Sequence, residues 1–256
     1  FKYGKIIIKK MKNKNILILG GNGKIGKPLT ESLLNKNYSI ISIDKKFDQR
    51  FKTKNINYLQ IDLMKKNIIK LFLNKIEKFN NITGAVNCLY LKSKSWGSSL
   101  DKLNENIIRE NLYTQLGLPI LISKEICKYF VKKKIKNGKL INISSVLGIS
   151  APKFEHYKNT KMFSPIEYST SKSGIVAMTK YLAKFYKGKN LNINCISPGG
   201  IYEKQPRSFI KKYKDICNKK GLLDGEDIVE TIIFLLSKNS DFISGQNLII
   251  DDGWSL

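Results

Sequence analysis

The chain has 256 residues, a mass of 29.3 kDa and 42% apolar residues. That is the size of one compact α/β domain with a sizeable core, and it excludes a disordered or fibrous protein. The sequence holds no apolar run of the length, roughly eighteen residues, that a transmembrane helix needs, so we expect no membrane span.

The formal net charge of +26 raises the question of a nucleic-acid partner, since a basic surface binds phosphates. However, the chain has 43 lysines and only three arginines, and nucleic-acid recognition relies heavily on arginine. The lysines are scattered among isoleucine and asparagine, whereas nucleic-acid binding would require them on one face. We therefore expect no nucleic-acid partner, and an anionic substrate stays open.

The cysteines and the single histidine, His156, show no metal-ligand spacing, so we expect no metal site. Reduced thiols are typical of a cytoplasmic protein, which is the location we expect. The apolar run within residues 1–10 is too short for a signal peptide. We expect these residues to be an extension, Met11 to be the natural first residue, and 11–256 to form a single domain.

The predicted elements alternate between strand and helix along the chain. Expected strands cover 15–19, 38–44, 57–62, 83–88, 139–144, 191–197 and 246–251, and expected helices follow the first glycine cluster and cover 65–79, 103–134, 165–187 and 224–236. Such alternation predicts an α/β fold, a Rossmann-type doubly wound parallel sheet with helices on both faces.

A glycine cluster, Gly20-Gly21-Asn22-Gly23-Lys24-Ile25-Gly26, directly follows the first strand and opens the first helix. Glycines at these places allow a tight turn, close approach of backbone to a pyrophosphate, and close packing of helix on strand. The cluster therefore predicts a dinucleotide cradle, although an ordinary tight turn between strand and helix has the same composition.

Acidic residues end the second and third expected strands. Asp44 lies eighteen residues after Gly26, where a carboxylate accepts hydrogen bonds from the adenosine ribose and repels a 2′-phosphate. NAD is therefore favoured over NADP, unless Lys45 and Lys46 turn inward and pair with that phosphate. Asp62 is placed to contact the adenine, or alternatively to cap the next helix.

Tyr168 and Lys172 are four residues apart in an expected helix, so a phenol and an ammonium share one face. We expect the cation to lower the pKa of Tyr168 and make it a general acid or base. A second Y-x-x-x-K pair, Tyr157 and Lys161, runs directly into Pro165 and lacks the helical apolar spacing. The sequence therefore favours Tyr168 as the reactive phenol.

Taken together, these motifs resemble the short-chain dehydrogenase/reductase family over essentially the whole stretch from Met11 to Leu256. The residues that carry the resemblance are Gly20-x-x-Gly23-x-x-Gly26, Asn87, Asn111, Ser144-Ser145, Tyr168-x-x-x-Lys172, Ser197-Pro198-Gly199, Gly245-Gln246 and Asp251-Asp252-Gly253. Within that family the stretches YLKSKSWG, APKFEHYKNTKMFSPIEYSTSKSG and GQNLIIDDGWSL are most similar to the flagellin-modification branch, whose members act in surface-sugar pathways.

The resemblance implies a role for each matching residue. Tyr168 would move the hydroxyl proton, Lys172 would lower its pKa and bind the nicotinamide ribose, and Ser145 would bind the reacting oxygen. Asn111 would hold a water that links Lys172 to bulk solvent. The cofactor contacts implied are Gly20, Asn22, Gly23, Ile25, Gly26, Asp44, Asp62, Leu63, Asn87, Lys172, Pro198, Gly199 and Ile201.

Strand geometry independently separates Ser145 from Ser144, because neighbouring side chains of a strand point to opposite faces. Simpler roles stay open for two of these residues. Ser145 is also a plausible backbone cap at a strand end, and Asn111 a polar helix residue bonded to neighbouring backbone.

The chain departs from the family pattern in three places, the first of which is Lys24, where many members have glycine. Residues 87–90 read Asn-Cys-Leu-Tyr instead of N-N-A-G, which makes the loop beside the nicotinamide bulkier. The gap between Ser145 and Tyr168 is also unusually long, and it carries the donors His156 and Lys161. We expect this insertion, together with Arg207 in the following polar segment, to bind substrate, unless it is a solvated surface loop.

The motifs and the resemblance thus favour an NAD-dependent oxidoreductase that interconverts a secondary alcohol and a ketone on a sugar or nucleotide sugar. The expected substrate is hydroxylated or phosphorylated and belongs to the biosynthesis of a surface glycan or flagellin modification, such as a nonulosonate. One alternative is a 3-oxoacyl thioester reductase that uses NADPH, against which Asp44 and the polar insertion speak. Another is a dinucleotide-binding regulatory protein without catalysis, against which the joint presence of Ser145, Tyr168 and Lys172 speaks. The resemblance also implies a homodimer or homotetramer formed through the helices over 103–134 and 165–187.

Overall fold

The computed structural model describes residues 14–46, 54–65 and 67–256. The expected extension over residues 1–10 and the expected first residue, Met11, lie outside this part of the chain.

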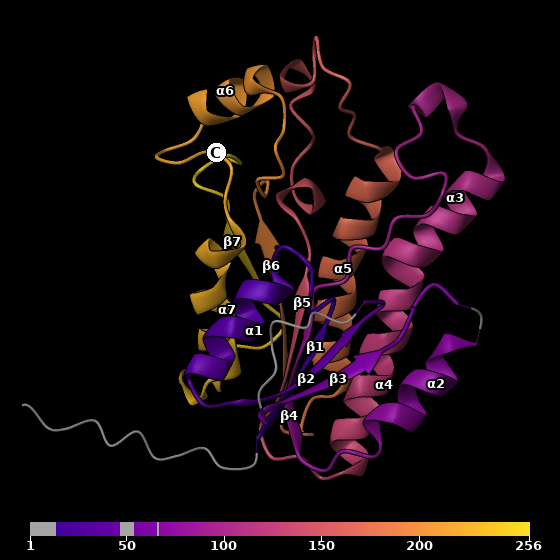
Figure 1. Ribbon diagram of the computed structural model, residues 1–256, viewed down its shortest axis with the longest axis vertical. Helices are drawn as coiled ribbons and strands as arrows, with labels where there is room; N and C mark the ends of the chain where they lie inside the picture. The colour runs from indigo at the N-terminus through magenta and orange to yellow at the C-terminus, as the bar shows by residue number, and fades with distance from the viewer. Residues whose placement is uncertain (1–13, 47–53, 66) are drawn as a thin grey trace, which may run out of the picture.

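The described residues form one seven-stranded, all-parallel sheet, shown in Figure 1, with strand order β3-β2-β1-β4-β5-β6-β7. The strands are β1 (Asn15–Leu19), β2 (Ser39–Asp44), β3 (Ile56–Gln60), β4 (Ile82–Asn87), β5 (Gly138–Ile143), β6 (Leu191–Pro198) and β7 (Asn247–Ile250). This confirms the predicted Rossmann-type doubly wound sheet.

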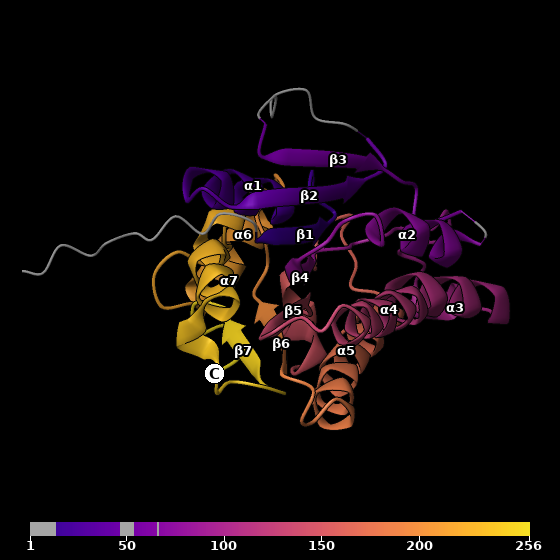
Figure 2. The same ribbon diagram turned by 90° about the horizontal axis from the view of Figure 1, so that it is seen from below.

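Helices cover both faces of the sheet. They are α1 (Gly26–Asn35), α2 (Ile68–Ile76), α3 (Glu105–Leu112), α4 (Leu118–Lys132), α5 (Ile166–Phe185), α6 (Arg207–Asp215) and α7 (Val229–Leu236). Figure 2 shows α1 and α7 on one face and α2, α4 and α5 on the other. Each face buries its own apolar cluster, because strands buried on both sides carry isoleucine, leucine or valine at successive positions.

Two predicted segments differ from the structure. The helix expected over 103–134 is divided into α3, a π-helical turn at Tyr113–Gly117, and α4. Pro119 in the first turn of α4 has no backbone N–H to donate to the carbonyl of Gln115, so the chain winds wider at this point. The polar segment after β6 contains a helix, α6, whose Phe209 and Tyr213 are buried.

The strand order reverses between β1 and β4, which lie side by side in the sheet. In parallel α/β sheets, ligands bind outside the carboxyl ends of the strands at this switch point. The turn after β1 lies directly against the turn after β4. A Cβ on Gly20 would be only 3.0 Å from the carbonyl oxygen of Cys88. The fold thus brings the glycine cluster to the crevice where a ligand is expected.

Two glycines in this turn have no substitute. Gly20 has φ +76°, which L side chains rarely adopt, and a Cβ on Gly26 would lie 2.1 Å from the carbonyl oxygen of Gly20. In the second contact the Cβ would meet a backbone atom, so no side-chain rotation relieves it.

We expect Gly26→Ala to lower the free energy of unfolding by about 1–3 kcal/mol, because the new methyl group overpacks the turn. Urea denaturation measures this as a lower midpoint at unchanged slope. The control is Lys27→Ala in the same helical turn, for which we expect a change within about 0.5 kcal/mol. Equal midpoints for Gly26→Ala and the unsubstituted chain would contradict the close packing.

Candidate active site

The expected site residues gather at the carboxyl edge of the sheet. Gly20 follows β1, Asp44 ends β2, Asn87 ends β4, Ser144 follows β5 and Pro198 ends β6. Because all strands are parallel, these ends lie along one edge, and the turns after β1 and β4 meet there. Residues far apart in the sequence therefore line one crevice.

Asp44 braces the glycine turn. Its carboxylate accepts hydrogen bonds from the backbone N–H groups of Asn22 at 3.0 Å and Lys45 at 2.7 Å. The side chain of Asn22 donates to the carbonyl of Lys46, while its own carbonyl oxygen is buried without a partner among the described residues. Both lysine side chains are exposed, and only their backbones engage this turn.

The N-terminus of α1 suits an anion. Ile25 occupies the N-cap position without capping the helix through its side chain, and the first turn carries no acidic residue. The exposed Gly23 donates its N–H to the carbonyl of Gly20 at 3.0 Å, which closes the turn in front of the helix. A pyrophosphate fits this cradle because uncapped N–H groups and the helix dipole both favour negative charge.

Asp62 and Leu63 follow β3. The Asp62 carboxylate accepts the backbone N–H of Met64 at 3.0 Å. It does not cap α2, which begins at Ile68 behind Asn67 as its N-cap residue. The side chain of Leu63 is buried in the core, so this residue can face a cofactor with its backbone only.

The remaining expected cofactor contacts lie at the ends of β4 and β6. Asn87 is buried, and its side-chain oxygen accepts the N–H of Leu89 at 3.3 Å. After Pro198, the N–H of Gly199 donates to the carbonyl of Ile250 at 2.8 Å, and Ile201 pairs in a bridge with Leu223. These contacts fix the backbone that borders the crevice on its β6 side.

Tyr168, Ser145 and Lys172 form a compact group. Tyr168 lies in the first turn of α5, and the hydroxyl of Ser145 forms a hydrogen bond with its phenol. The Nζ atom of Lys172, one helical turn later, is 5.5 Å from the centroid of the Tyr168 ring. The structure therefore brings together the three residues that the sequence analysis selected.

Close packing between α5 and the turn after β5 sets this geometry. Ser144 donates its hydroxyl to the carbonyl of Lys172 at 2.8 Å, and Ser173 donates to the carbonyl of Gly148 at 2.7 Å. A Cβ on Gly148 would be 2.7 Å from the carbonyl carbon of Lys172, so only glycine allows this approach. As strand alternation predicted, Ser144 faces the helix backbone and Ser145 faces Tyr168.

The electrostatics of the pair differ from the sequence-based expectation. The pKa of Tyr168 is raised, chiefly because burial disfavours the phenolate, while the Ser145 hydrogen bond opposes that shift. The expected lowering by Lys172 was wrong. Lys172 directs its ammonium to the carbonyl oxygen of Ile143 at 3.1 Å, and burial lowers its own pKa to about 8.

The structure shows which groups the Asn111 side chain binds, while the water-holding role that the resemblance implies stays a prediction. It is fully buried at the end of α3, where its amide donates to the carboxylate of Glu167 at 2.8 Å and its side-chain oxygen accepts from Ser93. Both ends of the side chain are thus engaged with residues other than Lys172. Asn111 joins α3, α5 and the loop after β4 in this structure.

Two aromatic residues, which the motifs did not single out individually, stand against Tyr168. The rings of Tyr90 and Trp96 lie with centroids 5.7 Å and 5.8 Å from that of Tyr168, and 5.8 Å from each other, all edge to face. The sequence showed only that the loop after Asn87 is bulky. Which of its rings contact Tyr168 depends on how the loop folds, and the sequence does not show that.

The insertion between β5 and α5 packs on α6 through His156. This side chain is buried among the rings of Phe209, Tyr213 and Trp254, with centroids 5.9–6.4 Å away. Burial lowers the pKa of His156, so the ring is neutral near pH 7. The expectation that His156 binds substrate is corrected accordingly: it anchors the insertion, which is more than a solvated loop.

The second Y-x-x-x-K pair is not helical, because Tyr157 follows a short 3-10 turn at Phe154–His156 and packs on Phe209 with ring centroids 5.2 Å apart. Lys161 and Arg207 are both exposed. Among the described residues, neither forms a hydrogen bond or ion pair with Tyr168, so their expected substrate contacts stay predictions.

In residues 14–46, 54–65 and 67–256, no cluster of histidine, cysteine and acidic residues could hold a metal ion. The helices of the same part of the chain are all too short or too polar to cross a membrane.

Comparison with known proteins shows the family. A family model described as enoyl-(acyl carrier protein) reductase matches residues 42–255. The chain is 38% identical to the post-translational flagellin modification protein A of Campylobacter coli, over 96% of this chain and 100% of that protein. It is 26% identical to a 3-oxoacyl-[acyl-carrier-protein] reductase of Buchnera aphidicola, over 95% of this chain and 98% of that protein.

A solved structure is similar over the whole chain. The short-chain dehydrogenase from Leptospira borgpetersenii with bound NAD+ superposes with a TM-score of 0.89 and 28% identity, over 100% of this chain and 98% of that one. Fold, motif geometry and these relatives agree. The chain belongs to the short-chain dehydrogenase/reductase family of NAD(P)-dependent oxidoreductases.

Proposed function

We propose that this protein uses NAD to interconvert a secondary alcohol and a ketone on a sugar or nucleotide-sugar substrate, in the biosynthesis of a surface glycan. The observation that carries the proposal is the group of Tyr168, Ser145 and Lys172 at the carboxyl edge of the sheet, beside an uncapped helix N-terminus.

The glycine turn and Asp44 are the residues that would hold the dinucleotide. At Gly20 and Gly26 the turn has no room for a side chain, which leaves its backbone N–H groups open to a phosphate. The buried oxygen of Asn22, without a partner among the described residues, can accept from a ligand hydroxyl. The similar Leptospira dehydrogenase has NAD+ bound. The bound cofactor would supply the acceptor or donor of the hydride.

Tyr168 is the group that exchanges the substrate proton. Its raised pKa keeps the phenol protonated at neutral pH, which suits proton donation to a carbonyl oxygen that Ser145 also contacts. The reverse reaction requires the phenol to lose that proton. Lys172, with a pKa of about 8, changes its own charge close to neutral pH and can balance the loss.

The sugar substrate rests on relatives and on the insertion. The relative of 38% identity is described as a flagellin modification protein, whereas the 3-oxoacyl reductase is 26% identical. Asp44 and the polar insertion also speak against a thioester reductase that uses NADPH. A regulatory protein without catalysis is disfavoured because Ser145, Tyr168 and Lys172 lie together, and binding a dinucleotide does not require Ser145 beside the phenol of Tyr168.

We also propose a homo-oligomer in the cytoplasm. Tyr181 and Phe185 on α5 are 68% and 67% exposed, with rings stacked at a centroid distance of 6.1 Å. Exposed aromatic pairs are typical of surfaces that bury themselves in a contact. The four cysteines are free thiols, as expected for a cytoplasmic protein.

Replacing the reactive phenol tests the catalytic assignment. We expect Tyr168→Phe to lower kcat by at least about a hundredfold, because the proton donor is lost and the ring packing is kept. Steady-state NADH formation or consumption measures it. The control, Tyr157→Phe, keeps the contact with Phe209 and should change kcat less than about threefold. The reverse order would move the active site to the second motif.

Cofactor choice tests the role of Asp44. We expect NADH to bind at least about tenfold more tightly than NADPH, because the carboxylate repels a 2′-phosphate. Asp44→Asn should narrow the difference between the two dissociation constants. We expect it to weaken the binding of NADH less than it strengthens the binding of NADPH. Titration of cofactor fluorescence measures both constants, and tighter binding of NADPH to the unsubstituted protein would refute the assignment.

The burial of Lys172 predicts a pH-dependent stability. Its folded pKa of about 8 lies below the ordinary value of 10.5, so the unfolded chain binds more protons between these values and stability rises across that window. Below pH 8 the buried ammonium is charged, and the folded chain carries the full free-energy cost of burying that charge. Lys172→Met should therefore be more stable than the unsubstituted chain at pH 7 by about 1–3 kcal/mol, and lose that advantage by pH 10.

Urea denaturation at pH 7 and pH 10 measures both free energies of unfolding. Lys70→Met, at an exposed position on α2, is the control and should show no such pH dependence. A Lys172→Met variant that is destabilised equally at both pH values would show that the lysine is not a strained buried charge.

A further inference from the structure

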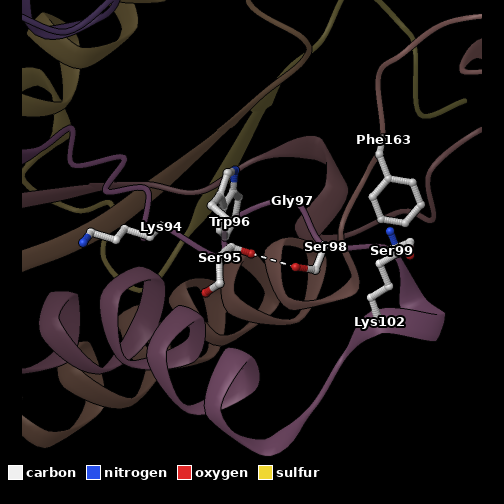
Figure 3. A pocket seen from close by; sticks show the side chains of 8 residues that line it. All are labelled: Lys94, Ser95, Trp96, Gly97, Ser98, Ser99, Lys102 and Phe163. Carbon is white, nitrogen blue, oxygen red and sulfur yellow. Dashed lines mark hydrogen bonds between the residues drawn. The ribbon is translucent and has the colours of Figure 1, made fainter.

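A hollow of about 420 Å³ lies beside Trp96, between the segment that follows β4 and the insertion before α5. Figure 3 shows it, with Lys102 and Ser99 close to the ring of Phe163 at one end and Lys94 extending from the other end. The lining residues are Lys94, Ser95, Trp96, Gly97, Ser98, Ser99, Lys102 and Phe163.

The chemistry of this lining favours an anion. Two lysines and three serines contribute to it, and no acidic residue does. Among the described residues, neither Lys94 nor Lys102 forms an ion pair, and the hydroxyl of Ser99 makes no hydrogen bond. The hollow therefore presents two lysines outside any such ion pair and a free hydroxyl donor, with an aromatic ring at each side.

The loop that forms the hollow is held in place before any ligand binds. Ser93 donates its hydroxyl to the side chain of Asn111, and Ser95 donates to the carboxylate of Glu110 at 2.8 Å. Ser98 in turn donates to the carbonyl of Ser95 at 2.9 Å. These bonds tie the loop to α3, so Trp96 and the serines require little ordering on binding.

The hollow adjoins the candidate active site through the ring of Trp96. Trp96 lines it, and the same ring lies edge to face against Tyr168 at 5.8 Å and Tyr90 at 5.8 Å. A ligand in the hollow therefore contacts the ring next to the reactive phenol. Trp96 therefore separates the hollow from the reactive phenol by the width of one aromatic side chain.

We propose that this hollow binds the phosphate of a sugar phosphate whose reacting carbon lies at Tyr168. Lys102 and Ser99 donate to the phosphate, Lys94 adds charge, and Trp96 packs against the sugar. A phosphate fits better than a carboxylate, because its three free oxygens can use donors that are spread around the hollow. The proposal rests on the proposed function for its sugar, but the anion site is testable without turnover.

Binding of inorganic phosphate tests the site directly. Trp96 and Trp254 are the only tryptophans in the sequence, and the first lines the hollow, so intrinsic fluorescence reports occupancy. We expect a saturable change with millimolar phosphate and none with potassium chloride at equal ionic strength. Lys94→Gln/Lys102→Gln should raise the midpoint at least about tenfold, as expected for loss of two charge-assisted contacts.

The matched control removes the same charge elsewhere. Lys70→Gln/Lys238→Gln changes two exposed lysines on α2 and after α7, and its midpoint should stay within about twofold of the unsubstituted protein. An equal response to acetate, an equal loss in the control variant, or no saturable response would each overturn the site. Phosphate held at the glycine turn would not depend on Lys94 or Lys102.

A kinetic comparison separates this inference from the proposed function. For a sugar that turns over with and without its phosphate, Lys94→Gln/Lys102→Gln should raise KM for the phosphorylated form at least about tenfold and leave KM for the neutral form unchanged. Equal effects on both forms would overturn the phosphate site and leave the oxidoreductase intact. Turnover that survives Tyr168→Phe would overturn the proposed function and leave the binding result standing.

Discussion

The structure depends on one electrostatic constraint, the burial of the Lys172 ammonium without a carboxylate partner among the described residues. It is 3% exposed, and its Nζ atom has the carbonyl of Ile143 as its hydrogen-bond acceptor. A buried charge is tolerated only where the surrounding backbone is fixed, and α5 meets that condition through Ser144, Ser173 and Gly148. The packing that permits the charge also places Ser145 against Tyr168.

The loop after β4 supplies the aromatic side chains that surround the reactive phenol. Asn111 and Glu110 hold Ser93 and Ser95, and that loop places Tyr90 and Trp96 against the reactive phenol. The insertion is held separately, by His156 among the rings of α6 and the C-terminal segment. The strand ends and α5 hold the reactive group, whereas the loop after β4 and the insertion are held by contacts of their own on the side of Tyr168.

The sequence predicted most of the fold and the reactive group. Alternating strands and helices predict a parallel sheet, and such a sheet brings Gly20, Asp44 and Asn87 to one edge whatever the loops do. The electrostatic direction at Tyr168, the role of His156 and the side-chain partners of Asn111 escaped prediction, because burial and tertiary contacts decide them. The break in the helix at Tyr113–Gly117 followed from Pro119, whose position was visible but whose effect on winding was not.

The most direct test of this account is the titration of Lys172 itself. In a protein with isotope-labelled lysine side chains, the Nζ or Cε resonance that disappears in Lys172→Met identifies the group by NMR. We expect this resonance to titrate near pH 8, well below the ordinary value of 10.5 for a lysine. Titration at or above that ordinary value would contradict the burial of an unpaired charge, because the ammonium would then be hydrated or paired.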